Sequence, residues 1–234
     1  VPPQDSDKWY EYWCNERLNW YIEHGIPEDM VMLRPHDEDE LSHYSTGTSD
    51  VEFKFPWGFD ELEGIAKRTD FDLKAHAAAS GEKLDYFDPQ TQERYVPYVI
   101  EPAAGATRTM AAFLLAAYDE DEVNGEVRTV LRLHPRLAPY KVAVLPLSKK
   151  DTLTPLAHEV RKLLADRYMV DYDETQNIGK RYRRQDEIGT PLAVTVDFDS
   201  LDDNAVTVRD RDTMEQVRVP IDQLLATVGE KLGL

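Results

Sequence analysis

Cysteine is almost absent from this sequence: Cys14 is the only one in 234 residues. A single thiol can form neither an internal disulfide nor a zinc site built from several thiolates. A reducing, cytoplasmic setting is therefore the expected one. Cys14 follows Trp13 in a helix-like stretch, which favours a buried structural thiol over a nucleophile.

Long apolar runs are also missing. No stretch approaches the roughly 18 apolar residues that a membrane-spanning helix needs, so we expect no membrane partner. The chain opens with Val1-Pro2-Pro3, which resembles neither an initiator methionine nor a signal peptide. This opening indicates the interior of a longer polypeptide.

Positive charge is scarce: 27 Lys and Arg stand against 45 Asp and Glu, a net charge of −18. This balance argues against a general nucleic-acid binder, because phosphate backbones attract cations. The imbalance belongs to one part of the chain, since residues 1–135 have 12 basic and 28 acidic residues, whereas residues 136–234 have 15 and 17. The asymmetry indicates two domains, of which the second can present a local basic face.

The first region combines strands, turns and helices. Aromatic residues at helical spacing predict a core-facing helix over 8–24, and alternating apolar and charged residues predict strands at 51–55 and 61–66. Residues 33–43 read as a solvated connection. The other expected elements are a helix at 69–79, a hairpin at 85–94, a strand at 95–100 and an apolar helix at 109–118. This order predicts an α+β fold, an antiparallel sheet backed by helices.

The second region has a different texture. Residues 141–147 form a continuous apolar run, as expected of a strand buried on both faces. Helices are expected at 154–168, 178–187 and 220–232, and strands at 168–172, 192–198, 204–209 and 214–219, with an acidic hairpin at 200–204. Strand–helix alternation followed by a hairpin predicts a small α/β domain with a mixed sheet. We place the domain boundary between residues 136 and 137, near Pro135 and Pro139.

Two segments of the first region could carry chemistry. Residues 100–108 read as a strand, a small-residue turn and a helix start, where a ligand can approach the backbone and an anion is favoured. Arg108 lies at the start of this helix, where the helix dipole disfavours a cation. We therefore expect Arg108 to have an anionic partner. In the second segment, Glu61 and Glu63 should alternate onto one strand face beside Arg68, able to bind an ammonium group or a metal. The alternative for the first segment is a tight turn with a surface arginine. The alternative for the second is a solvated acidic face.

Five segments resemble glycyl-tRNA synthetases of the class II, bacterial dimeric type. They are GFDELEGIAKRTDFDL (58–73), YVPYVIEPAAGATR (95–108), RTVLRLHPRLAPYKVAVLPLSKK (128–150), NIGKRYRRQDEIGTP (177–191) and DNAVTVRDRDTMEQVRVP (203–220). The second resembles the third class II signature, and the last two resemble the family's anticodon-binding domain. The resemblance covers nearly the whole chain in the right order. It implies the C-terminal part of a catalytic domain at 1–136 and an anticodon-binding domain at 137–234.

The resemblance also implies a reaction, ATP-dependent ligation of glycine to tRNA(Gly) through glycyl-adenylate, in a cytoplasmic homodimer. Arg108 and Glu101 would be catalytic, and Glu61 could hold Mg²⁺ that comes with ATP. The implied ATP contacts are Glu61, Leu62, Gly105, Ala106, Thr107 and Arg108. The implied glycine contacts are Glu101, Pro102, Ala103, Ala104, Gly105 and Arg68. Ala103 departs from the family's commoner serine, so a hydroxyl contact to glycine would be missing.

Lys180, Arg181, Arg183 and Arg184 place cations within five residues and would contact tRNA. The Arg209–Asp212 segment reads instead as an internal salt-bridge ladder. The first two class II signatures are missing, so this chain alone should be inactive. Two further readings stay open: a non-catalytic nucleic-acid-binding subunit of the same fold, and a sister synthetase for another amino acid.

Overall fold

The computed structural model describes residues 1–233, which divide into two compact units, Val1–Ala116 and Ala117–Leu234. The division lies earlier in the chain than the boundary expected at 136/137. Residues 118–131, which lie before the expected boundary, therefore belong to the second compact unit. The 136/137 limit stays a prediction about the domains of the family.

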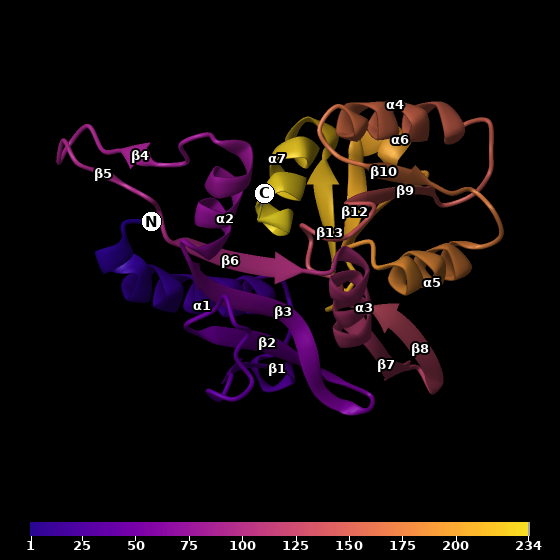
Figure 1. Cartoon of the computed structure of the whole chain (residues 1–234). Helices are drawn as coiled ribbons and strands as arrows, with labels where there is room; N and C mark the ends of the chain where they lie inside the picture. The colour runs from indigo at the N-terminus through magenta and orange to yellow at the C-terminus, as the bar shows by residue number, and fades with distance from the viewer. Residues whose placement is uncertain (234) are drawn as a thin grey trace. The chain divides into compact units, whose positions relative to one another are not determined.

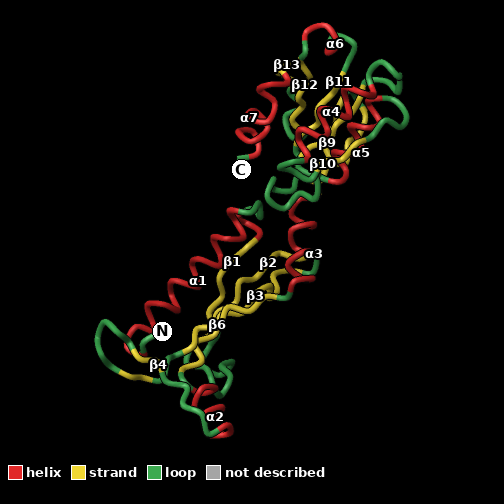
Figure 2. Tube along the Cα trace, turned by 90° about the horizontal axis from the view of Figure 1, so that it is seen from above, coloured by secondary structure: helices red, strands yellow, loops and turns green. Residues whose placement is uncertain are grey.

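The first unit is built on a four-stranded antiparallel sheet with the order β1-β2-β3-β6 (Figure 1). Helix α1 lies along one face of this sheet (Figure 2). The elements are η1 Pro3–Asp5, α1 Ser6–Glu23, η2 Glu28–Met30, β1 Val31–Pro35, β2 Thr48–Phe55, β3 Gly58–Thr69, α2 Phe71–Ser80, β4 Tyr86–Phe87, β5 Arg94–Tyr95, β6 Val99–Ala104 and α3 Ala106–Ala117. The predicted antiparallel sheet with helices is confirmed at this level.

The core of this unit lies between α1, α3 and the sheet. Tyr21 of α1 stacks on Phe113 of α3 with ring centroids 6.0 Å apart, and Phe53 and Ile65 of the sheet are fully buried. Cys14 is also buried, with 4% of its surface exposed, as expected of a structural thiol.

The second unit contains a five-stranded mixed sheet with the order β10-β9-β11-β12-β13. The first three strands are parallel and the last three antiparallel, which confirms the predicted mixed sheet. Its elements are β7 Tyr118–Val123, β8 Glu126–Leu131, β9 Val142–Pro146, α4 Thr154–Ala165, β10 Val170–Tyr172, α5 Ile178–Ile188, β11 Leu192–Val196, α6 Ser200–Asp203, β12 Ala205–Asp210, β13 Gln216–Pro220 and α7 Ile221–Leu232.

Every residue of β9 and β11 is buried, because helices cover both faces of these strands. Helices α4 and α7 pack their apolar residues on one face, and Ile178 and Tyr182 of α5 pack on the other. The apolar run at 141–147 thus predicted its environment correctly.

Several local predictions were wrong. The single strand expected at 95–100 is interrupted, because β5 ends at Tyr95 and β6 begins at Val99. Residues 33–43 begin within strand β1, and the helix expected at 109–118 starts at Ala106 and ends at Ala117, so that Tyr118 opens β7. The expected hairpin at 200–204 is the short helix α6, ended by Asn204 in the left-handed conformation with φ 51°. Asparagine tolerates this conformation better than most residues.

The β7–β8 hairpin escaped sequence reasoning entirely, and it packs against α5. Helix α5 ends at Gly189 with φ +83°, and a Cβ there would lie 2.9 Å from the Leu131 carbonyl oxygen of β8. Glycine is required at this position by both its conformation and the close approach of the hairpin. In the described part of the chain, no helix combines the length and apolar character needed to cross a membrane.

Candidate functional site

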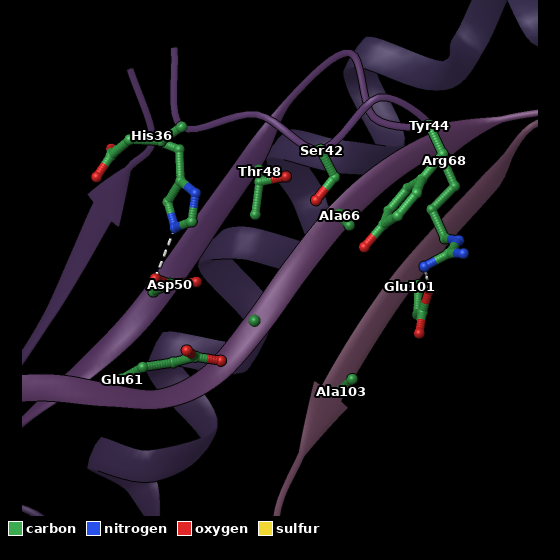
Figure 3. A pocket seen from close by; sticks show the side chains of 12 residues that line it. His36, Ser42, Tyr44, Thr48, Asp50, Glu61, Ala66, Arg68, Glu101 and Ala103 are labelled. Atoms are coloured by element: carbon green, nitrogen blue, oxygen red, sulfur yellow. Dashed lines mark hydrogen bonds and ion pairs between the residues drawn. The ribbon is translucent and has the colours of Figure 1, made fainter. Parts of the chain in front are cut away.

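A pocket of about 350 Å³ opens on the face of the first unit's sheet that α1 does not cover (Figure 3). Its walls come from the strands and from the loop between β1 and β2. It is lined by His36, Glu40, Ser42, Tyr44, Thr48, Asp50, Glu61, Gly64, Ala66, Arg68, Glu101 and Ala103.

The pocket floor consists of minimal side chains because of the strand register. Gly64 pairs with Asp50 on one side and with Ala103 on the other, and Ala66 pairs with Thr48 and Glu101. Side chains on one face of a sheet recur every second residue, so these two rows face the same way. A small molecule can therefore reach the backbone at the centre, with charged groups around it.

Arg68 and Glu101, both predicted glycine contacts, meet in this pocket. Arg68 Nη1 lies 2.7 Å from Glu101 Oε2, and Arg68 Nε lies 2.7 Å from Asp72 Oδ2. The guanidinium also stacks over Tyr44 at 4.1 Å from the ring centroid. The hydrogen bond with Asp72 and the charge of Glu101 raise the pKa of Arg68, and Arg68 lowers the pKa of Asp72. The second oxygen of Glu101 has no donor in the described residues.

Glu61 and Glu63 do not share a face, contrary to the sequence prediction. Val51 pairs with Glu63 and Glu52 with Glu61, so Leu62 is an extra residue in a β-bulge that breaks the alternation. Glu61 consequently lines the pocket, whereas Glu63 is 2% exposed on the α1 side of the sheet.

Glu63 has a structural role. Arg17 Nε and the Tyr21 hydroxyl of α1 each donate to its carboxylate at 2.7 Å. Burial, together with the neighbouring Glu63, raises the pKa of Tyr21. Glu63 therefore ties α1 to the sheet and is not free to bind a ligand.

Arg108 lies outside the pocket, in the first turn of α3. Its Nη2 is 2.8 Å from Asp60 Oδ2 on β3, and its guanidinium lies over Phe55 of β2 at 4.9 Å. Hydrogen bonds from Trp57 and from Arg108 lower the pKa of Asp60. The anionic partner expected of Arg108 is thus a carboxylate of the chain itself, while the arginine side chain stays 43% exposed.

The remaining predicted ligand contacts differ in accessibility. Leu62 is 2% exposed, so it is not accessible to a ligand in this structure. Pro102 and Ala104 alternate with Glu101 and Ala103 and do not line the pocket. Gly105, Ala106 and Thr107 are exposed where β6 meets α3.

Sequence reasoning missed the half of the pocket formed by the β1–β2 loop. His36 Nε2 lies 2.6 Å from Asp50 Oδ2, and Tyr44 covers Arg68. The polar composition of this loop predicts a solvated connection, not a pocket wall. The one available signal was His36 next to the acidic run 37–40, which alone is not specific.

The four predicted tRNA-binding cations of α5 are not equivalent. Arg181 is 2% exposed and donates to the backbone carbonyls of Glu174, Thr175 and Gln176 and of Pro146. Arg184 is bonded to Asp173, and Arg183 lies 3.7 Å from Asp186. Lys180 is exposed and pairs with no carboxylate of residues 1–233. Arg181 is therefore unsuited to contact RNA, whereas Lys180 and Arg183 line a groove of about 490 Å³.

Arg209 and Arg211 form internal ion pairs, as the sequence indicated, although not as a simple ladder. Arg209 makes a two-point contact with Asp186 at 2.8 and 3.1 Å, and Arg211 pairs with Asp212 at 2.7 Å. No group of three or more potential metal ligands is clustered in residues 1–233. Glu61 could hold Mg²⁺ only together with ligands from a bound nucleotide, which is the common arrangement for this ion.

Residues 141–231 match the family described as anticodon binding domain. Curated relatives match over nearly the whole chain. The glycine–tRNA ligase of Macrococcus caseolyticus is 58% identical over 98% of this chain, and that of Bacillus cereus is 57% identical over 98%. The glycine–tRNA ligase of Corynebacterium glutamicum is 55% identical over 99%.

The chain spans about half the length of these curated relatives, 50% of the first two and 52% of the third. The chain covers about half of each relative and contains an anticodon-binding domain. Both findings agree with the prediction that it is the C-terminal part of a synthetase. The chain is thus homologous, over 98–99% of its length, to the C-terminal half of glycine–tRNA ligases.

Proposed function

We propose that this chain is the C-terminal half of an enzyme that joins glycine to tRNA(Gly), using ATP and passing through glycyl-adenylate. The observation that carries the proposal is the identity of 55–58% to glycine–tRNA ligases over 98–99% of the chain. In the class II mechanism the glycine carboxylate attacks the α-phosphate of ATP and pyrophosphate leaves. The terminal ribose of tRNA then takes the glycyl group.

In this proposal the pocket of the first unit binds glycine. The free oxygen of Glu101 accepts the ammonium group, and Arg68 holds Glu101 in place through its 2.7 Å contact. A charge-assisted hydrogen bond of this kind contributes about 1.5–3 kcal/mol. Larger amino acids are excluded by overlap with the carboxylates and backbone around Gly64, which discriminates more strongly than a missing methylene would.

ATP would bind next to glycine, where β3 and α3 approach each other. Arg108 would exchange its contact with Asp60 for a contact with the γ-phosphate of ATP. The exposed turn 105–107 would also contact ATP. Glu61 would help to hold Mg²⁺, which would neutralise charge on the phosphates. Catalysis would then rest on positioning and on electrostatic stabilisation, which needs no covalent nucleophile from the protein.

The second unit would bind the anticodon stem or loop of tRNA(Gly). Lys180 and Arg183 on α5 are the cations left to contact phosphates, since Arg181 and Arg184 are engaged within the unit. Gln216 lines the same groove as Lys180 and Arg183, and its exposed amide is suited to hydrogen bonds with unstacked bases.

The test is glycine-dependent ATP–pyrophosphate exchange by the full-length ligase that contains this sequence, with glycine and ATP varied separately. Glu101→Gln keeps the shape but removes the charge, so glycine use should fall about 10- to 150-fold. Arg108→Ala should reduce ATP use, and Arg108→Lys should recover it in part because the planar fork is lost. Glu82→Gln, at an exposed position outside the pocket, is the matched control.

Two outcomes would contradict these assignments. Were Glu101→Gln to change only the ATP dependence, the glycine site would lie elsewhere. Were the full-length wild-type protein to show no exchange with glycine, or exchange with another amino acid, the proposed function itself would fail.

A further inference from the structure

A histidine–aspartate pair in the pocket has no role in the function proposed above. His36 follows β1 and Asp50 lies on β2, and Nε2 of the histidine is 2.6 Å from Oδ2 of the aspartate (Figure 3). The Asp50 side chain is 9% exposed and that of His36 is 20% exposed. The carboxylate is thus nearly enclosed, while the imidazole reaches the pocket that Glu101 and Arg68 also line.

The contact with Asp50 fixes which ring nitrogen is free. An ionised carboxylate can only accept a hydrogen bond, so Nε2 carries the proton and donates it. In the neutral form of the ring the lone pair is then on Nδ1, which has no partner in residues 1–233. A neutral imidazole with a free nitrogen, held by a carboxylate behind it, is the arrangement of a general base.

Other pocket residues are less suited to accept a proton. Glu40 is bound by both terminal nitrogens of Arg34 at 2.9 Å, and Glu101 is paired with Arg68. Glu61 has an open carboxylate but is the candidate Mg²⁺ ligand, and a carboxylate bound to a metal is a weak base. His36 is the remaining group with a basic nitrogen that no other residue in the described part of the chain engages.

We propose that His36 is the general base of the second half-reaction, the transfer of glycine to tRNA; this rests on the function proposed above. Nδ1 takes the proton of the terminal ribose hydroxyl as its oxygen attacks the carbonyl carbon of glycyl-adenylate. The new ester C–O bond forms, the bond from that carbon to the phosphate oxygen breaks, and AMP leaves with the electron pair. Asp50 stabilises the imidazolium, which afterwards releases its proton to water.

This role separates the two half-reactions, because adenylate formation needs no base: the glycine carboxylate is already ionised. His36→Gln retains an N–H that can donate to Asp50 but has no basic nitrogen. In the full-length ligase, single-turnover transfer from preformed glycyl-adenylate to tRNA should fall on the order of 10²- to 10⁴-fold. Pyrophosphate exchange should change by less than about threefold. The matched control is His76→Gln, on the exposed side of α2, which should leave both rates unaltered.

Asp50→Asn tests the same proton transfer by changing the residue that is hydrogen-bonded to His36. An amide can donate to Nε2 and so move the proton to Nδ1, which removes the free lone pair, and transfer should again fall more than exchange. Equal losses in both half-reactions would mean that the pair only supports the pocket, and would overturn the proposal. Transfer at the wild-type rate in His36→Gln would overturn it as well. Absence of exchange in the wild-type ligase would instead contradict the proposed function.

Discussion

The two units of this chain use charged side chains in opposite ways. In the first unit, Arg68, Glu101 and Arg108 are between 20% and 43% exposed, and each has contacts that leave part of the group open. In the second unit, the side chains of Arg128 and Asp186 are at most 1% exposed, and Arg209 is 6% exposed. The first unit, with 10 basic and 23 acidic residues, keeps these three groups accessible although it buries Glu63. The second unit, with 17 basic and 22 acidic residues, buries several of its ionic groups.

This difference shows that the basic character of a segment does not measure its capacity to bind RNA. Arg181 is as basic as Lys180, but its guanidinium is saturated by backbone carbonyls of the loop before α5 and of Pro146 at the end of β9. Buried arginines of this kind join segments that are far apart in the sequence, here α5 and the end of β9. Their removal should affect stability, and removal of the accessible ones should affect binding.

The largest expected effect comes from Asp186, which Arg209 grips at two points and which Arg128 also approaches. Asp186→Asn leaves these guanidinium groups without a buried counter-charge, so the second unit should lose about 3–5 kcal/mol of unfolding free energy. Glu101→Gln is the matched change in the first unit. Because Glu101 is 42% exposed, its stability cost should stay below about 1 kcal/mol.

Denaturant unfolding of the chain can assign this loss to a unit. All four tryptophans, Trp9, Trp13, Trp20 and Trp57, belong to the first unit, so their fluorescence follows that unit alone. Circular dichroism follows both units. Asp186→Asn should shift only the dichroism transition, and a parallel shift of the fluorescence transition would show that the units do not unfold independently.

A smaller effect is expected within α5, where neighbouring arginines have different environments. Arg181→Met should cost about 3 kcal/mol, because carbonyl oxygens are left without donors in a buried position. Arg183→Met should change the unfolding free energy by less than about 0.5 kcal/mol, since its side chain is 34% exposed and its ion pair is long, at 3.7 Å. Equal costs would mean that the buried contacts of Arg181 contribute nothing beyond those of a surface residue.

The sequence predicted regular elements better than the details that form the site. The spacing of aromatic residues placed α1, although Tyr21 is the only one of them that is buried, and a continuous apolar run placed β9. The sequence could not reveal the bulge at Leu62 that separates Glu61 from Glu63, because the bulge depends on pairing with β2. Nor could it reveal His36 beside Asp50, which come together only when β1 pairs with β2. The burial of Arg181 escaped prediction for the same reason, since its acceptors include Pro146, far away in sequence.

The acid sensitivity of the second unit is a further, smaller effect. The hydrogen bond from Arg128 lowers the pKa of Asp121 to about 2, from about 3.9 in an unfolded chain. A lowered pKa means that this carboxylate contributes stability above about pH 4 and that the contribution disappears as the pH falls toward 2. The denaturation midpoint of the second unit should therefore decline across this range. Asp121→Asn should have a lower midpoint at pH 7 and a shallower decline, and an unchanged acid profile would contradict the assignment.

The smallest effect should appear in tRNA binding by the accessible cations of α5. Each phosphate contact adds roughly 0.7–0.9 to the slope of log affinity against log salt. If Lys180 and Arg183 each contact a phosphate, the double change to Ala should lower this slope by about 1.4–1.8 and weaken binding most at low salt. The control is Arg161→Ala with Lys162→Ala on α4, which removes the same charge from an exposed position outside the groove.

The control distinguishes a local contact from a general effect of net charge. If both double variants lowered the slope equally, tRNA would be attracted by overall charge, and α5 would have no special part. If neither did, the accessible cations would be solvated surface groups like those elsewhere on the second unit. A lower slope only in the Lys180 and Arg183 double variant, with the unfolding free energy unchanged, would show that these two residues bind RNA. Arg181, on the same helix, would instead support the fold, because its guanidinium donates to backbone carbonyls.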